Sequence, residues 1–248
     1  REEAAYFQSD LENLLDKEVL IFPSSYRKPF DFTQPDPGNV LQRAEVLNEL
    51  IHATEFGKLI VTYPEALAER VINRDSLEKN TLEISQGAKL NIEFINEFLI
   101  EYEFERVDFV YAPGQFSIRG GIVDIFSFSN DLPYRFEFFG DFIESIRTFQ
   151  IEDQLSAEQV KSVTIVPNVQ SKFLTEHNIS LLEYIDSGTS VWFKDVQFTL
   201  DILKEGYKKA NELWKALPAD TRSQNPEWID PKYSFTDDKL LADQLKDF

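Results

Sequence analysis

Residues 108–149 read DFVYAPGQFSIRGGIVDIFSFSNDLPYRFEFFGDFIESIRTF, and this stretch determines how the rest of the chain is interpreted. Runs rich in aromatic and β-branched residues alternate with Gly, Pro, Asn and Asp, which is typical of short β-strands joined by tight turns. The pair Gly120-Gly121 would weaken an ordinary strand, so it indicates a bulge or a close approach of two backbones. Gly140-Asp141 separates two such runs and predicts a two-residue hairpin turn, because Gly adopts positive φ at little cost.

The predicted hairpin has two different faces. Its register places on one face the pairs Phe139 with Phe142, Glu137 with Glu144, and Arg135 with Ile146. The other face carries the side chains expected in the core, namely Phe136, Phe138 and Ile143. Two opposed glutamates repel, so a cation is expected nearby, from Arg119 or Arg135. The resulting patch of Arg, Glu and exposed Phe has the residue types of a binding surface. On the residues alone, the more ordinary interpretation is a half-buried sheet whose ion pairs satisfy each other.

The chain is strongly acidic. It has 248 residues, with 25 Lys and Arg against 44 Asp and Glu, for a formal net charge of −19. The central region 73–167 is also acidic, with eight basic and seventeen acidic residues. Binding to DNA through bulk electrostatics is therefore not expected, because phosphate contacts need clustered Lys and Arg.

Several kinds of chemistry are absent from the sequence. There is no Cys, and the two histidines, His52 and His177, have no partner at metal-ligand spacing. The pair Gly57-Lys58 lacks the surrounding pattern of a phosphate-binding P-loop. Asp124 in the run VDIF is expected as a sheet-edge or turn partner rather than a Mg²⁺ ligand. No apolar stretch approaches the length of a membrane helix. We expect no catalytic, cofactor or metal residues, and no enzyme activity, in this chain by itself.

The flanking regions have an α/β pattern. Helical periodicity at 3–16, 40–53 and 64–72 alternates with short apolar runs at 19–22 and 58–63, and a run at 190–194 precedes a helix over 198–216. This alternation predicts a parallel sheet, with its first strand expected before Arg1. Between them, a strand at 81–85, a helix over 90–102, the hairpin-linked strands and a strand within 161–168 predict an antiparallel α+β domain.

The predicted domains are thus 1–72 and 169–248, two parts of one split α/β domain, and 73–168, an α+β domain inserted into it. The second part ends in a helix over 237–248, with Thr236 or Asp237 as its N-cap. Residues 218–236 before it hold several prolines and are expected to form a loop.

The motif PGQFSIRGGIVDIF, followed by PYRFEFFGDFIESIRTF, closely resembles the N-terminal, UvrB-like region of bacterial transcription-repair coupling factors. The resemblance continues weakly through LIVTYPEALAERV before the motif and SVTIVPN after it. It implies a degenerate RecA-like domain split by an inserted domain of the type that binds UvrA, the damage-recognition subunit of nucleotide excision repair.

The resemblance also implies a function and a location. A protein of this family recruits UvrA to stalled RNA polymerase in transcription-coupled DNA repair, in the cytoplasm. The whole protein is an ATP-dependent, helicase-like DNA translocase. Its ATP, Mg²⁺, RNA polymerase and DNA contacts are expected in other domains of the parent protein, and no membrane partner is expected. The UvrA-binding face is expected to have an intramolecular partner too, the C-terminal domain of the parent.

Four residues match the partner-binding motifs of the family, namely Arg119 of the R-G-G segment and Arg135, Glu137 and Phe139 of the R-x-E-F-F-G segment. With this partner we expect the arginines to contact carboxylates of UvrA and Phe139 to fill an apolar pocket. Glu137 is expected either to pair with a cation of the partner or to hold Arg135 in position. Ser117 stands where UvrB proteins carry another Arg, which favours the coupling factor over UvrB. The short segment 23–39 agrees, because it lacks the Tyr-rich hairpin of UvrB.

Three alternatives remain open at this point. The chain could be part of a UvrB-type excision-repair protein, which predicts an ATP site and the Tyr-rich hairpin. It could be a catalytic ATPase fragment, which predicts nucleotide binding. It could also be a structural module without a partner, in which the Arg, Glu and Phe patch only satisfies itself.

Overall fold

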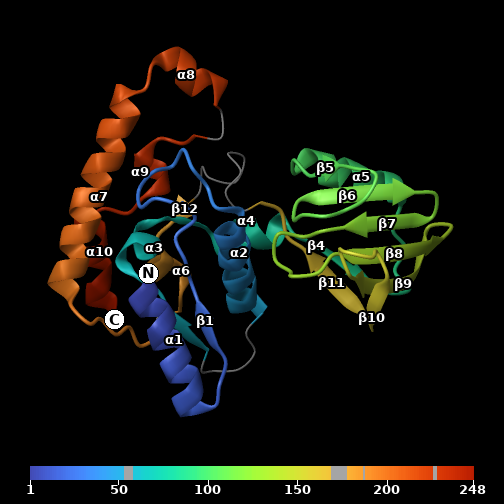
Figure 1. The fold of residues 1–248 in the computed structure, drawn as a ribbon, viewed down its shortest axis with the longest axis horizontal. Coiled ribbons are helices and arrows are strands. Elements are labelled where there is room, and N and C mark those ends of the chain that lie inside the picture. Colours follow the sequence, from blue (N-terminus) through green and yellow to red (C-terminus); the bar gives the residue numbers. More distant parts are fainter. Residues whose placement is uncertain (53–57, 169–177, 187, 226–227) are drawn as a thin grey trace. The chain divides into compact units, whose positions relative to one another are not determined.

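A computed structural model of the chain describes residues 1–52, 58–168, 178–186, 188–225 and 228–248 (Figure 1). Its internal contacts divide the chain into two compact units. Unit 1 consists of Arg1–Ser76 and Val169–Phe248, and unit 2 of Leu77–Asn168. Helix α4 (Arg74–Lys79) carries the first boundary.

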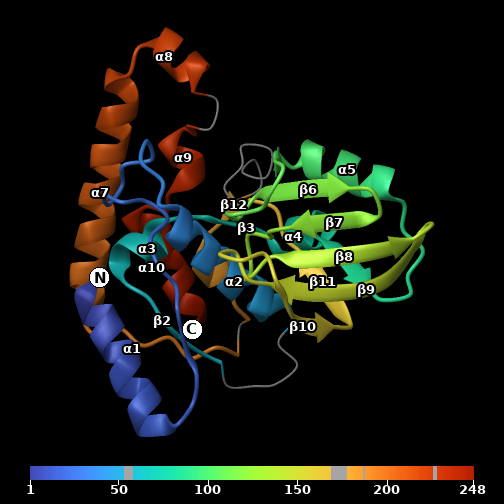
Figure 2. The ribbon, with the colours of Figure 1, turned by 45° about the vertical axis from the view of Figure 1, so that its right-hand side comes forward.

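Unit 2 is built on a six-stranded sheet with the order β10-β9-β8-β7-β6-β5 (Figure 2). Neighbouring strands run antiparallel, except that β5 and β6 are parallel. The strands are β5 (Glu105–Arg106), β6 (Gln115–Arg119), β7 (Ile122–Ile125), β8 (Tyr134–Phe139), β9 (Phe142–Phe149) and β10 (Ser156–Val160). A separate antiparallel pair joins β4 (Leu82–Ser85) to β11 (Ser162–Ile165). The predicted antiparallel α+β pattern is therefore confirmed.

Helix α5 (Ile92–Glu101) supplies the other half of the core of unit 2. Its first turn is capped by Asn91, whose side chain accepts a hydrogen bond from the backbone N–H of Glu93 at 2.7 Å. The helix buries Ile95 and Leu99, which are spaced i and i+4 and so lie on one face. These side chains pack against one face of the sheet, among Phe116, Val123, Ile125, Phe136, Ile143 and Ile146.

The predicted hairpin forms, but its register differs from the prediction by a bulge. Phe139 lies opposite Phe142 as predicted, whereas Glu137 lies opposite Ser145 rather than Glu144. Arg135 lies opposite Arg147 rather than Ile146, which pairs with the buried Phe136. The extra residue, Glu144, has no partner on β8 and is exposed, so the expected repulsion between two glutamates is absent.

The pair Gly120-Gly121 lies in the turn between β6 and β7. Gly120 has φ 62°, in the left-handed region that favours glycine. A Cβ on Gly121 would lie 3.1 Å from the carbonyl oxygen of Phe138, whose N–H donates to the Gly121 carbonyl at 2.8 Å. Of the two predicted roles, the close backbone approach is confirmed.

Unit 1 is a mixture of short strands and helices. Strand β1 (Val19–Ile21) pairs in parallel with β2 (Leu59–Val61), and β3 (Val71–Ile72) pairs antiparallel with β12 (Asn178–Ile179). The helices are α1 (Glu2–Leu15), α2 (Pro37–His52), α3 (Pro64–Ala68), α6 (Leu181–Tyr184), α7 (Val196–Ala216), α8 (Ala219–Gln224), α9 (Pro231–Ser234) and α10 (Asp238–Gln244), followed by the 3₁₀ turn Leu245–Asp247. Asp237 caps α10 by accepting from the Leu240 N–H, as predicted.

The prediction of a buried strand at 190–194 is wrong. Trp192 is 92% exposed, and none of the described strands pairs with this segment. A short apolar run forms a strand only where a neighbouring strand supplies backbone partners. Parallel pairing in the described parts of unit 1 is limited to β1 and β2, so a larger parallel sheet is not observed there. Among the described residues, no helix has both the length and the apolar character needed to cross a bilayer.

Candidate partner-binding site

The strands of unit 2 place all four predicted site residues on one face of the sheet. Arg119 and Glu137 lie in one cross-strand row with Ile122, and Arg135 lies in the next row with Asp124. Phe139 follows Glu137 by two positions and so points to the same side. This is the face opposite the core packed by α5, and we call it the polar face.

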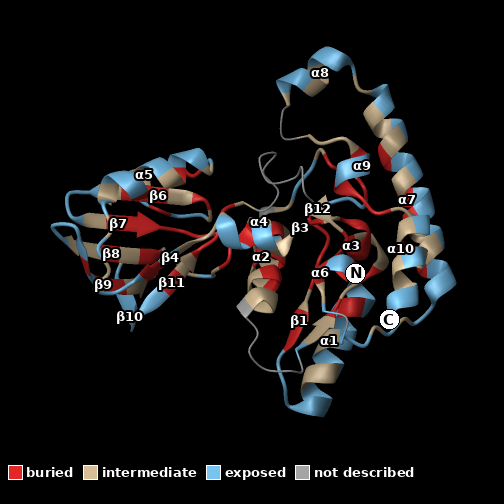
Figure 3. Ribbon diagram, turned by 180° about the vertical axis from the view of Figure 1, so that it is seen from behind, coloured by how far each residue is buried: buried red, intermediate tan, exposed pale blue. Residues whose placement is uncertain are grey.

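Asp124 is the centre of the polar face. It lies on β7, in the interior of the sheet, and is fully buried. Figure 3 shows much of β7 in the colour of buried residues. Its Oδ1 accepts from Nε of Arg135 at 2.8 Å, and its Oδ2 accepts from Nη2 of Arg135 at 2.9 Å. The same Oδ2 accepts from Nη2 of Arg119 at 2.5 Å. One buried carboxylate therefore positions two guanidinium groups, with bidentate geometry toward Arg135.

Arg135 is the more enclosed of the two arginines, with its side chain 15% exposed. It also donates from Nη1 to the Gln154 carbonyl at 3.0 Å, and its guanidinium lies 4.5 Å from the ring centroid of the buried Phe149. The hydrogen bond to Asp124 is the main cause that raises the pKa of Arg135, against the opposing effect of burial. Arg135 is thus held on several sides by unit 2 itself.

Arg119 is more accessible, with its side chain 37% exposed. Besides Asp124, it donates from Nη1 to the Asp108 carbonyl at 2.5 Å and to Oγ of Ser117 at 3.0 Å. Its guanidinium lies 5.3 Å from the ring centroid of Phe109. Arg119 therefore has a fixed geometry and an exposed edge.

Glu137 and Phe139 complete the predicted set. Glu137 accepts from Oγ of Ser145 at 2.5 Å, and its Oε2 lies 3.5 Å from Nη2 of Arg147. Glu137 therefore forms its ion pair with Arg147, while Arg135, one of the two cations expected nearby, also interacts electrostatically with Glu137, which contributes to its raised pKa. Phe139 is 78% exposed at the end of β8, next to the similarly exposed Phe142.

Two residues of this region were not assigned to the site from the sequence. Asp124 was predicted as a sheet-edge or turn partner, which is wrong, because β7 lies between β6 and β8. A charged residue inside the apolar run IVDIF was the available signal, since such a residue in a central strand needs a buried counter-charge. Phe109 gave no local signal, because its contact with Arg119 depends on the folded loop.

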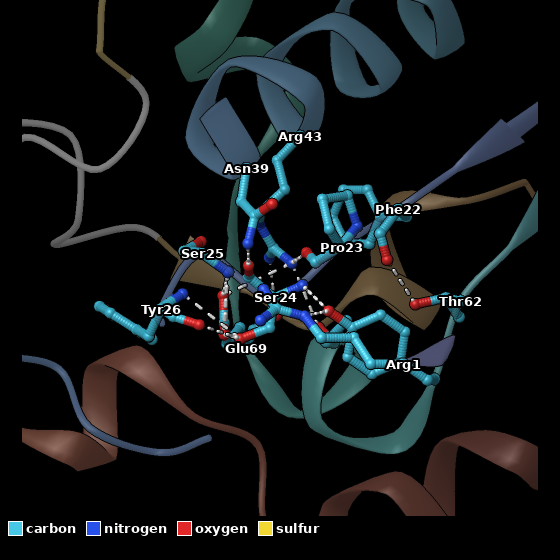
Figure 4. A network of polar contacts seen from close by, with 12 residues as sticks. Arg1, Phe22, Pro23, Ser24, Ser25, Tyr26, Asn39, Arg43, Thr62 and Glu69 are labelled. Carbon is cyan, nitrogen blue, oxygen red and sulfur yellow. Dashed lines mark hydrogen bonds and ion pairs between the residues drawn. The ribbon is translucent and has the colours of Figure 1, made fainter. Parts of the chain in front are cut away.

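Unit 1 contains a second arginine–carboxylate cluster (Figure 4). Arg43 lies 3.5 Å from Oε2 of Glu69, and both side chains are 3% exposed. Arg43 also donates to the Pro23 carbonyl at 2.7 Å, and Glu69 accepts from Oγ of Ser24 at 2.5 Å and from the Ser25 N–H at 2.8 Å. Burial lowers the pKa of Arg43, with Glu69 opposing the change. This cluster joins segments within unit 1 and presents almost no surface.

Neither cluster has the residues of a metal centre. Within the described ranges, no group of three or more His, Asp or Glu is placed to hold a metal ion. The polar face instead offers a fixed guanidinium edge beside exposed aromatic rings. Arg and aromatic side chains are the types that dominate the energetics of protein interfaces.

Comparison with known proteins gives the class of unit 2. Residues 82–170 match the family model described as UvrB interaction domain. The matched region holds the six-stranded sheet and all four predicted site residues. Unit 2 is therefore similar to the UvrB interaction domain over most of its length.

Comparison with whole proteins shows which protein the chain is similar to. It is 33% identical over 190 residues to the transcription-repair-coupling factor of Bacillus subtilis (strain 168), covering 76% of this chain and 16% of that protein. It is 31% identical over 163 residues to the same factor of Myxococcus xanthus, covering 66% of this chain and 14% of the relative. For Escherichia coli (strain K12) the identity is 27% over 164 residues, with coverage of 66% and 14%.

These relatives confirm the resemblance to transcription-repair coupling factors that the motifs indicated. The chain spans only about a seventh of the length of the relatives it matches.

Proposed function

We propose that unit 2 binds UvrA through its polar face, and that the chain is the part of a transcription-repair coupling factor that recruits UvrA to stalled RNA polymerase. The observation that carries this proposal is the convergence of Arg119, Arg135, Glu137 and Phe139 on one face of a UvrB interaction domain. The relatives named above are coupling factors, which supports this function over that of UvrB itself.

The proposed contacts follow from the exposure of each residue. Arg119 keeps an open edge of its guanidinium for a carboxylate of UvrA, and Phe139 offers a nearly free ring for an apolar pocket. Asp124, which Arg135 fixes through two hydrogen bonds, holds Arg119 in place, while Glu137 pairs with Arg147 beside them. Removing one member of a charge pair that is buried in an interface typically costs about 2–5 kcal/mol of binding free energy.

The wider assignment is also a proposal. Unit 1 would be a degenerate RecA-like domain made of 1–72 and 169–248, which the parallel β1–β2 pair supports. Within the parent protein, ATP, Mg²⁺, DNA and RNA polymerase would be bound by other domains, a C-terminal domain would cover the polar face, and the protein would act in the cytoplasm. This chain would contribute no catalytic step.

One observation favours the competing structural interpretation in part. Arg119 and Arg135 share the buried Asp124, so part of the patch satisfies itself. This interpretation explains Arg135, which is mostly enclosed, but it gives no reason for Phe139, which is largely exposed and is absent from the cores of unit 2. Phe139 is therefore the residue on which the two interpretations differ most.

The test is calorimetric titration of the chain with purified UvrA. We expect the wild type to bind, and Phe139→Ala to weaken binding roughly tenfold or more, as expected for an aromatic anchor. The matched control is Phe94→Ala, because Phe94 is 48% exposed on α5, which packs on the opposite face. No binding by the wild type, or equal losses for the two variants, would contradict the proposal.

A further inference from the structure

The loop between β5 and β6 carries two exposed aromatic rings, and one of them, Phe109, lies beside Arg119 of the polar face. Phe109 is 50% exposed, and Tyr111 is exposed to a similar extent. Val110 lies between them and is fully buried, so the loop alternates between outward and inward side chains. Neither aromatic ring belongs to the R-G-G or R-x-E-F-F-G segments.

The loop is held in one conformation by several independent contacts. Oε1 of Gln115 accepts from the N–H groups of Tyr111 at 3.0 Å and Ala112 at 3.1 Å. Gly114 has φ +83°, and its N–H donates to the Phe126 carbonyl at 2.8 Å. Val110 packs with Phe126 and Phe149 in a small core of their own. The exposed rings are therefore carried on a rigid support.

The loop is continuous with the proposed binding site. Phe149, in the small core under the loop, is also the ring beneath the guanidinium of Arg135. Arg119 donates to the Asp108 carbonyl and lies over the ring of Phe109. The same arginine thus contacts Asp124 at the centre of the polar face and Phe109 at its edge.

We propose that Phe109 is a second aromatic anchor for UvrA, so that the binding surface extends from the sheet onto this loop. This inference rests on the proposed function. The partner surface would present a carboxylate to Arg119, with an apolar contact for Phe109 next to it. A ring on a preorganised loop loses little conformational freedom on binding, which favours its use as an anchor. The stacked ring also limits the access of water to one side of the Arg119 guanidinium, which strengthens a carboxylate contact there.

The test compares the dissociation constants of the chain and UvrA for wild type, Phe109→Ala and the control Phe94→Ala. We expect Phe109→Ala to weaken binding about tenfold and Phe94→Ala to change it less than about twofold. The melting temperature should change by only a few degrees for either variant, because both rings are half exposed. If Phe109→Ala lowers the melting temperature by more than a few degrees, Phe109→Leu is used in its place. The expected loss of affinity for UvrA is then smaller.

A second measurement needs no variant. Hydrogen exchange of the wild-type chain with and without UvrA should show new protection of the backbone amides in 107–113 and in β8. This inference would be overturned if UvrA protects β8 but not the loop. It would also be overturned if Phe109→Ala and Phe109→Leu both bind like the wild type. Either result leaves the proposed function in place. A wild-type chain that does not bind UvrA would overturn both.

Discussion

The two units use the same chemistry, a carboxylate paired with arginine, with opposite consequences for the surface. In unit 1 both Arg43 and Glu69 are almost completely enclosed. In unit 2 only Asp124 is enclosed, while Arg135 and Arg119 are progressively more exposed. The first cluster presents almost no surface, so its contacts are made within the fold. The second cluster holds the guanidinium groups of Arg119 and Arg135, whose exposed edges remain available to a partner.

The second cluster explains how a strongly acidic chain can offer a cationic contact. A buried carboxylate compensates the cost of enclosing Arg135 and holds Arg119 in one orientation. The guanidinium has five donors, and Arg119 uses Nη1 and Nη2 within the unit. Preorganised donors lose less entropy on binding than a mobile surface lysine would. Variants of the two clusters can show which residues stabilise the fold and which keep a cation available to a partner.

The largest effect is expected in unit 1. Glu69→Gln removes the charge that compensates Arg43 and weakens the acceptor for Ser24 and Ser25. Leaving one charge buried without its partner costs about 3–5 kcal/mol. Thermal and urea unfolding would measure the loss. The control is Glu3→Gln, which breaks an ion pair to Lys194 between two highly exposed side chains and should leave the melting temperature unchanged.

A smaller loss of stability is expected from Asp124→Asn in unit 2. The amide keeps the shape of the side chain but no longer compensates two arginines. Because both guanidinium groups have some contact with water, the expected cost is about 2–3 kcal/mol, below that of a fully enclosed pair. Hydrogen exchange should place the loss in β6–β8. An Asp124→Asn protein as stable as the wild type would show that Asp124 does not organise the face.

The next effect concerns alkaline pH and the buried tyrosines of the two units. Burial, and secondly Glu69, raise the pKa of Tyr26 in unit 1, and burial raises the pKa of Tyr134 in unit 2. A raised folded pKa means that this stability is present below about pH 10 and is lost as pH rises from the unfolded pKa through the folded pKa. Tyr26→Phe should therefore flatten the decline of the melting temperature above that pH. An unchanged slope would contradict the raised pKa.

Local features of this structure could be predicted from the sequence, whereas features that depend on neighbouring strands could not. The turn at Gly140-Asp141 and the Phe139–Phe142 pair follow from local chemistry, and both were correct. The bulge at Glu144 shifts the register so that Ile146 pairs with the buried Phe136. A prediction from the hairpin alone does not include this packing, so it gave the wrong partners for Glu137 and Arg135. The strand expected at 190–194 failed for a similar reason, because strand formation needs a neighbour that local periodicity does not reveal.

At the candidate site, too, some features could be predicted from the sequence and others required the fold. The motif residues were expected on one face, and the register places them there. The role of Asp124 could not be read from the sequence, because it follows from the order of β6, β7 and β8 in the sheet. The contact between Phe109 and Arg119 spans ten positions across a loop and likewise requires the fold.

The most direct test of the central claim uses Arg119→Ala, with stability and UvrA binding measured on the same sample. Asp124 keeps its bidentate contact with Arg135 in this variant, so the free energy of unfolding should fall by less than about 1 kcal/mol. Binding should weaken by about 2–5 kcal/mol. The control is Arg106→Ala on β5, an exposed arginine opposite the core residue Phe116 and so on the other face.

We predict weakened binding with an intact fold for Arg119→Ala, and no change in either quantity for Arg106→Ala. Wild-type binding by Arg119→Ala, or a loss of stability as large as that of Asp124→Asn, would contradict the claim that the buried carboxylate presents Arg119 to a partner.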